Sequence, residues 1–291
     1  MQSKVSRERR TLLEALFFFL PAYLLLGVLW IYPMAYAVYL SFFNQDLMRP
    51  YQFNFVGLRN YLTFLTSDPN TATVLWATLA ITGLAVIGSF AVGLATAAIM
   101  EKKKSRLIRA LVIYPYAVPT VVVSLLTLWI TNPTFGILTY AIYLVTGSKV
   151  NLLVQPTTAL LTDVAAFIWK YYPFSTLILL AALEGVPVEL SEAASLDGAS
   201  PLQRYIFVTL PSIRKTLSVL GILLIIFGFQ CFDILYMVTY GGPALSTTNM
   251  VLYVYQTAFY SLKMSYGSTV GVFSTLGMMV LTIVYLRTMQ E

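Results

Sequence analysis

The sequence predicts an all-α membrane protein with six transmembrane helices, and three observations support this. The chain is 58% hydrophobic and 10% charged, whereas soluble domains carry about 25% charged residues. Its mean hydropathy is +0.78. Apolar stretches long enough to cross a bilayer, which takes about 20 helical residues, occur at Glu14–Phe43, Val74–Met100, Leu107–Thr131, Thr158–Leu183, Thr216–Val238 and Ser268–Leu286. The first is too long for the apolar core of a signal peptide.

The distribution of Lys and Arg predicts the orientation of these helices, because cytoplasmic segments carry an excess of positive residues. With the N-terminus inside, the cytoplasmic side holds Lys4, Arg7, Arg9, Arg10, Lys102, Lys103, Lys104, Arg106, Arg109, Arg204, Arg214, Lys215 and Arg287. The outer side then holds Arg49, Arg59, Lys149 and Lys263. We therefore expect both termini in the cytoplasm, with residues 1–13 as a tail and residues 14–291 as one transmembrane domain.

Composition also disfavours several classes of function. The net charge of +6 comes from residues that flank apolar segments, so no nucleic-acid partner is expected. One cysteine and no histidine exclude a Cys/His metal site and remove the commonest general base. A lipid-modifying membrane enzyme and a stand-alone channel are the alternatives to a transporter subunit. An enzyme of that class needs clustered acidic or basic residues at the membrane surface. It is disfavoured because the only acidic cluster, between Glu184 and Asp197, lies on the loop described next, which has another role.

That loop, residues 184–213 between the fourth and fifth helices, reads as two short helices and is called the coupling loop below. Pro187 suits a first helical turn, and Gly198 permits the left-handed residue that ends a helix. Ser200 followed by Pro201 is typical of an N-cap and a first helical residue. A hairpin held between two membrane helices can transmit a push to both. A plain amphipathic hairpin on the membrane surface is the alternative.

The loop resembles the signature of importer permeases in the ATP-binding-cassette superfamily: Glu-Ala-Ala, three residues, Gly, nine residues, Ile, one residue, Leu-Pro. Glu192-Ala193-Ala194, Gly198 and Leu210-Pro211 match at full spacing, and Val208 replaces the isoleucine. Blocks typical of the sugar-type branch, which resembles the maltose-transporter membrane subunits, occur at Val56–Tyr61, Leu183–Pro187, Phe232-Asp233, Thr239–Pro243, Thr247-Thr248, Ala258-Phe259 and Tyr266-Gly267.

The resemblance implies a bacterial inner-membrane subunit that imports a carbohydrate or polyol without being an enzyme itself. It implies four partners: a second similar permease, two ATPase subunits that bind ATP and Mg²⁺, and an extracytoplasmic solute-binding protein. The chain has no phosphate-binding loop of its own. Ala194–Arg204 would form the coupling helix, and the residues expected at the ATPase joint are Glu192, Ala193, Ala194, Asp197, Gly198, Ala199 and Arg204.

The substrate path is expected on the fourth and fifth helices. Sugars are commonly held by aromatic faces together with a few polar groups. By the resemblance, the contact positions are Phe167, Lys170, Tyr171, Phe174, Leu224, Phe227 and Gly228. Leu224 and Gly228 stand where relatives carry small polar residues, which argues against maltose itself. An aromatic-rich interface between helices is the alternative.

Two charged residues in the fourth helix, Asp163 and Lys170, are seven residues apart and share a helix face. Charges inside membranes are costly and usually face an interior or a partner. They could form an ion pair with the lysine reaching toward the interface, or Lys170 could contact an oxygen-rich or anionic substrate. Import of glycerol phosphate or another phosphorylated polyol is therefore the alternative to sugar import.

Overall fold

The computed structural model describes residues 17–49, 51–102 and 105–290. Almost all regular structure is helical, which confirms the predicted class. The predicted tail, residues 1–13, and two of the predicted cytoplasmic lysines, Lys103 and Lys104, lie outside the described residues. The chain divides into two compact units: Met1–Ser67 with Val254–Phe273, and Asp68–Tyr253 with Ser274–Glu291.

The smaller unit contains the first membrane helix, Phe17–Ser41, which includes a π-helical turn η1 (Gly27–Ile31) and α2 (Tyr32–Ser41). A two-residue hairpin follows, with β1 (Phe43–Asn44) antiparallel to β2 (Asn54–Phe55). It is completed by α3 (Arg59–Thr66), η3 (Gln256–Tyr260) and the start of α15 (Met264–Gln290). The side chains along the apolar stretch of the first helix are exposed, as expected for a helix that faces lipid or another subunit.

The Val56–Tyr61 block has a structural role within this unit. Asn60 donates from its side-chain amide to the carbonyl oxygens of Ser41 (3.0 Å) and Phe43 (2.7 Å). The hydroxyl of Tyr61 pairs with that of Ser41 at 2.6 Å. The last carbonyls of a helix have no partner within the helix, so this block satisfies the C-terminus of the first membrane helix.

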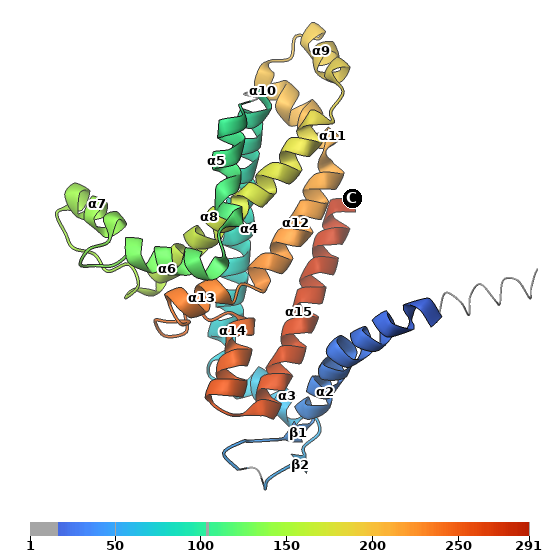
Figure 1. Ribbon diagram of the computed structural model, residues 1–291, viewed down its shortest axis with the longest axis vertical. Coiled ribbons are helices and arrows are strands. Elements are labelled where there is room, and N and C mark those ends of the chain that lie inside the picture. The colour runs from blue at the N-terminus through green and yellow to red at the C-terminus, as the bar shows by residue number, and fades with distance from the viewer. Residues whose placement is uncertain (1–16, 50, 103–104, 291) are drawn as a thin grey trace, which may run out of the picture. The chain divides into compact units, whose positions relative to one another are not determined.

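The larger unit is built on long helices, with bounds α4 (Thr71–Lys102), α5 (Arg106–Ala117), α6 (Thr120–Ile130), α7 (Ile137–Thr146), α8 (Pro156–Glu184), α12 (Arg214–Phe229), α13 (Asp233–Val238) and α14 (Met250–Tyr255). Helix α8 lies beside α4, α5 and α12 (Figure 1). Their shared core contains an apolar cluster that includes Met100, Leu179, Leu220 and Leu224.

The third predicted membrane helix differs from the expectation of one straight segment over Leu107–Thr131. Helices α5 and α6 meet at an angle of 95°. Pro119 lacks the backbone N–H that would continue the helix and pushes the residue before it out of the helical region. Val118 is accordingly extended, with φ −72° and ψ 129°. Among the described residues, five helices can each cross a membrane, and the bent pair is the sixth candidate.

Glycines bring α4 and α8 together at Gly88 and Gly93. A Cβ at Gly93 would overlap Ser175 Cβ and lie 3.3 Å from the backbone of Ser175 and Thr176. A Cβ at Gly83 would meet nothing within 4 Å, so that glycine is not used for close approach within the described residues. Small residues that let membrane helices approach are a recurrent packing device.

Gly93→Ala is therefore expected to destabilise the permease by about 1–3 kcal/mol, the usual cost of overpacking. The reason is that the backbone of α8 must move to admit one methyl group. Gly83→Ala, on the same helix with open space, is the matched control and is expected to be neutral. Thermal unfolding in detergent measures both. Equal midpoints for the two variants would contradict the close approach of α4 and α8.

Candidate functional site

The coupling loop folds as two short helices joined by a tight turn, as predicted. Helix α9 (Val188–Leu196) is followed by Asp197 and by Gly198, whose φ is +83°. The N–H of Ala199 donates to the Ala194 carbonyl (3.0 Å), and the N–H of Gly198 donates to that of Ser195 (3.1 Å). This is the Schellman arrangement, which favours glycine at the left-handed position.

Helix α10 (Pro201–Arg204) begins at a capping box formed by Ser200 and Gln203. The Ser200 hydroxyl accepts from the Gln203 N–H (3.3 Å), and the Gln203 side chain accepts from the Ser200 N–H (2.8 Å). These bonds fix the helix start. The resemblance implied one coupling helix over Ala194–Arg204, and the structure differs from this. The stretch is the end of α9, a turn and α10, because Gly198 and Ser200 stop one helix and start the next.

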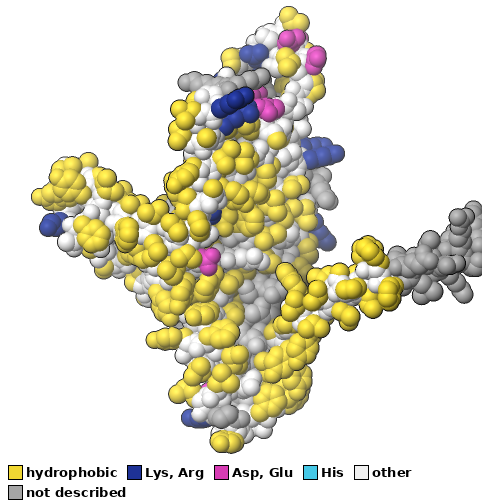
Figure 2. All heavy atoms as spheres, in the orientation of Figure 1, with side chains coloured by type: hydrophobic (Ala, Val, Ile, Leu, Met, Phe, Trp, Pro, Cys, Tyr) yellow, Lys and Arg dark blue, Asp and Glu magenta, His cyan; other side chains and the backbone are white. Residues whose placement is uncertain are grey.

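The outer surface of the loop is left uncovered by the residues that the structure describes. None of the residues of α9 and α10 is buried, and the side chains of Leu196 and Leu202 are 90% and 67% exposed. Glu192, Ala193, Asp197 and Gly198 are exposed, whereas Ala194, Ala199 and Arg204 are half-buried. Figure 2 shows charged side chains gathered at this end of the larger unit, above a flank covered by hydrophobic side chains.

The base of the loop is tied to the membrane helices. Glu184 forms an ion pair with Arg109 of α5 at 3.0 Å. The returning segment, η2 (Tyr205–Thr209) and α11 (Leu210–Ser212), leads into α12. Tyr205 and Leu210 pack against the core of α4, α8 and α12, and burial together with the charge of Glu101 raises the pKa of Tyr205. A loop packed this way can pass a force to several helices.

The four aromatic residues among the predicted path residues, Phe167, Tyr171, Phe174 and Phe227, form one cluster, called the aromatic cluster below. The ring centroid of Tyr171 lies 4.4 Å from that of Phe167 and 5.3 Å from that of Phe227. Phe174 lies 5.5 Å from Phe227. Tyr116, at the end of α5, completes the cluster at 5.6 Å from Phe174.

The seven predicted path residues occupy two kinds of position. Tyr171, Phe174 and Phe227 are half-buried, so their rings can meet a ligand. The other four are buried and can support the cluster without being accessible to a ligand: Phe167, Lys170, Leu224 and Gly228. Gly228 lies against α4, where an added Cβ would be 3.3 Å from Thr82 Cα. Tyr116 belongs to the cluster but was not among the predicted path residues. The sequence signal nearest to it is Pro119, three residues later, because a proline marks a probable break in a helix.

Two helix breaks adjoin the cluster, and each is held by one buried polar side chain. Lys170 donates to the carbonyl oxygens of Tyr116 (2.7 Å) and Val118 (2.6 Å) at the α5–α6 break. Asn249 donates to those of Phe229 (3.1 Å) and Cys231 (2.9 Å) at the α12–α13 break. Irregular backbone at membrane depth must be satisfied by other protein groups, and broken helices are typical of transporter binding sites.

The part of the sequence that forms these features also matches a known protein family. Residues 89–290 match the family described as "Binding-protein-dependent transport system inner membrane component". The match covers more than half of the chain and includes the coupling loop, the aromatic cluster and both helix breaks. The chain belongs to this family. It is therefore a multi-pass permease of the inner membrane.

Curated relatives cover most of the permease. It is 33% identical over 269 residues to a sulfoquinovosyl glycerol transport system permease protein of Agrobacterium fabrum, with 92% of this chain and 87% of the relative covered. It is 36% identical over 236 residues to a trehalose/maltose transport system permease protein of Thermococcus litoralis, covering 80% and 79%. It is 30% identical to an sn-glycerol-3-phosphate transport system permease protein of Pectobacterium atrosepticum, covering 92% and 91%.

Solved structures confirm the fold. The permease superposes with a TM-score of 0.82 on a chain of a bacterial ABC transporter involved in the import of the acidic polysaccharide alginate. The alignment covers 100% of this chain and 99% of that chain, at 20% identity. At that identity the likeness concerns the fold alone.

Asp163 of the permease is held by the Thr239–Thr248 segment. It is 1% exposed, and its Oδ2 accepts from the Thr239 hydroxyl at 2.8 Å, which also pairs with the Thr247 hydroxyl at 2.6 Å. Lys170 instead bonds to backbone carbonyls, so these two charges have different partners. The second Asp163 oxygen, Oδ1, has no hydrogen-bond partner among the described residues.

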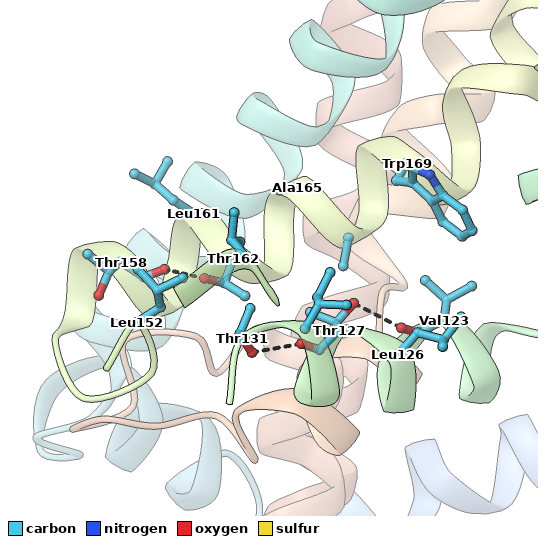
Figure 3. Close-up of a pocket in the computed structure, with 13 residues that line it drawn as sticks. Val123, Leu126, Thr127, Thr131, Leu152, Thr158, Leu161, Thr162, Ala165 and Trp169 are labelled. Carbon is cyan, nitrogen blue, oxygen red and sulfur yellow. Dashed lines mark hydrogen bonds between the residues drawn. The ribbon is translucent and has the colours of Figure 1, made fainter. Parts of the chain in front are cut away.

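A groove of about 630 Å³ lies between α6 and α8. Figure 3 shows its mainly hydrophobic lining, with Leu126, Leu161 and Trp169 at its walls. Its threonine hydroxyls donate to backbone carbonyls of their own helices, as Thr127 does to Val123 (2.9 Å) and Thr162 to Thr158 (2.8 Å). A sugar needs partners for many hydroxyl groups, so the groove fits apolar groups better than a sugar.

Proposed function

We propose that this permease moves a carbohydrate into the cytoplasm, driven by ATP that partner subunits hydrolyse. The aromatic cluster carries the proposal: Tyr171, Phe174 and Phe227 bring partly exposed rings from two helices to one place. Rings of this kind stack against the apolar faces of sugars. The names of relatives that transport trehalose or maltose support the same class of substrate.

The proposed assembly contains a second, similar permease, two ATPase subunits and an extracytoplasmic solute-binding protein. The exposed Leu196 and Leu202 of the coupling loop suit a surface that a partner covers, because apolar side chains gain free energy when removed from water. In this proposal ATP and Mg²⁺ bind to the ATPase subunits. The Glu192, Gly198 and Arg204 region would be the joint through which ATP-dependent closure reaches the membrane helices.

The test is uptake by the complete complex in proteoliposomes with its binding protein. The expected result is saturable, ATP-dependent uptake of a neutral saccharide from a panel that includes mono-, di- and oligosaccharides. A phosphorylated polyol is the second candidate, because one relative is named for sn-glycerol-3-phosphate. Uptake of glycerol phosphate alone would favour that candidate, and uptake without ATP would contradict the proposal.

Tyr171→Ala is expected to raise the KM for the transported saccharide about tenfold, which corresponds to ~1.4 kcal/mol. The change removes the ring between Phe167 and Phe227, whereas Tyr171→Phe keeps the ring and should stay near wild type. Tyr143→Ala is the control, because Tyr143 pairs with Tyr140 on α7, outside the cluster. An unchanged KM in Tyr171→Ala would remove the cluster from the substrate path.

A further inference from the structure

The break between α5 and α6 leaves backbone carbonyls that need partners. Helix α5 ends at Ala117 and α6 starts at Thr120, with a 95° turn between them. A straight helix would pair the carbonyl oxygens of Tyr116 and Val118 with N–H groups four residues later. The bend removes that arrangement. In a membrane, where water is scarce, such carbonyls must find protein donors.

Lys170 supplies those donors from α8. Its Nζ lies 2.7 Å from the oxygen of Tyr116, in the last turn of α5, and 2.6 Å from the oxygen of Val118, which lies between α5 and α6. The same Nζ is 5.1 Å from the centroid of the Tyr116 ring, a cation–π distance. Lys170 is only 7% exposed. An ammonium has three donor hydrogens, and two of them are already used by the backbone.

The residue that Lys170 holds belongs to the aromatic cluster. The ring of Tyr116 lies 5.6 Å from that of Phe174 and 6.5 Å from that of Tyr171. A change in the bend would therefore move one wall of the cluster. We propose that Lys170 is a positioning residue, which pins the α5–α6 break and so fixes Tyr116 in the cluster, and that it acts on transport through the backbone instead of binding the substrate.

The second break supports the same physical reasoning. Asn249, 1% exposed, donates to the carbonyl oxygen of Phe229, the last residue of α12, and to that of Cys231, which lies between α12 and α13. Both interruptions next to the cluster are thus bridged by one buried donor from a different segment. A charged residue inside a membrane is costly, and the neutral amide of Asn249 serves the second break without that cost because it lies close to the carbonyls. Lys170 reaches across from α8 with a longer side chain.

The experiment measures the bend directly in the complete complex. Spin labels on Leu111→Cys and Leu125→Cys report on α5 and α6, in a Cys231→Ser background that removes the native thiol. Both labelled positions are exposed in this chain. Pulsed electron paramagnetic resonance gives the distance distribution without any substrate, so the result is independent of whether the proposed carbohydrate is correct. Uptake is measured in parallel.

Lys170→Met, which removes the donors, is expected to broaden or shift the distance distribution and to lower uptake about tenfold or more. Lys170→Arg keeps donors and should retain the wild-type distance and most of the uptake. Lys149→Met, which changes an exposed lysine elsewhere, is the matched control and should change neither.

Lost uptake in Lys170→Met with an unchanged distance distribution would overturn the proposal, because the ammonium would then act on the substrate. Unchanged uptake in Lys170→Met would overturn it as well. If that variant does not assemble while Lys149→Met does, Lys170→Arg decides: the wild-type distance supports the clamp, and a shifted distance overturns it.

Discussion

Gly198→Ala is expected to leave the permease folded in the membrane and to lower ATP-driven uptake about tenfold or more. Gly198 has φ +83°, where a Cβ costs roughly 1–2 kcal/mol; 1.4 kcal/mol corresponds to a factor of ten. No described residue lies within 4 Å of the added Cβ, so the methyl group would point toward whatever covers the loop. Uptake and co-purification of the ATPase measure the effect.

Gly147→Ala is the matched control for this prediction. Gly147 ends α7 with φ +67°, and an added Cβ there also meets no described residue within 4 Å. The two variants therefore share the backbone strain and differ in whether they lie on the coupling loop. Uptake near wild type in Gly147→Ala and a loss in Gly198→Ala would support coupling through the loop. Equal losses would assign the effect to strain, and full uptake in Gly198→Ala would remove the loop from the joint.

Asn249→Leu is expected to lower the thermal midpoint of the detergent-solubilised permease by about 10 °C or more. The substitution keeps the side-chain size but removes the donors to the Phe229 and Cys231 carbonyls. It also removes the acceptor for the Leu252 N–H, which lies 2.9 Å from Asn249 Oδ1. Each buried polar group left without a partner costs about 1–3 kcal/mol. Size-exclusion chromatography after heating measures the loss of folded protein.

Asn151→Leu controls for replacing an asparagine by leucine. Asn151 is exposed, and its side chain accepts one bond, from the Leu153 N–H at 3.1 Å. Its midpoint should change by only about 2 °C, because exposed substitutions usually have small effects. A similar drop in both variants would show that Asn249 is not a special support for the α12–α13 break.

Much of the coupling loop was predictable because its signals are local. Gly198 ends a helix because a glycine tolerates φ +83°, and Ser200 with Pro201 starts the next helix through bonds within four residues. Asn249 was predictable in part, since an asparagine directly before an apolar run is a typical N-cap. Its second role, across the break to residues 229 and 231, has no local signal.

The sequence by itself determined the membrane class, the number of apolar segments and the two-helix coupling loop, because hydrophobicity and capping act over short stretches of chain. The tertiary structure decided that the third segment bends by 95°, that Lys170 serves the freed carbonyls at the bend, and that Asp163 pairs with Thr239. These partners are 52 to 76 residues apart in sequence. A buried charge must find a partner in a low-dielectric interior, and only the packing of helices brings that partner within reach.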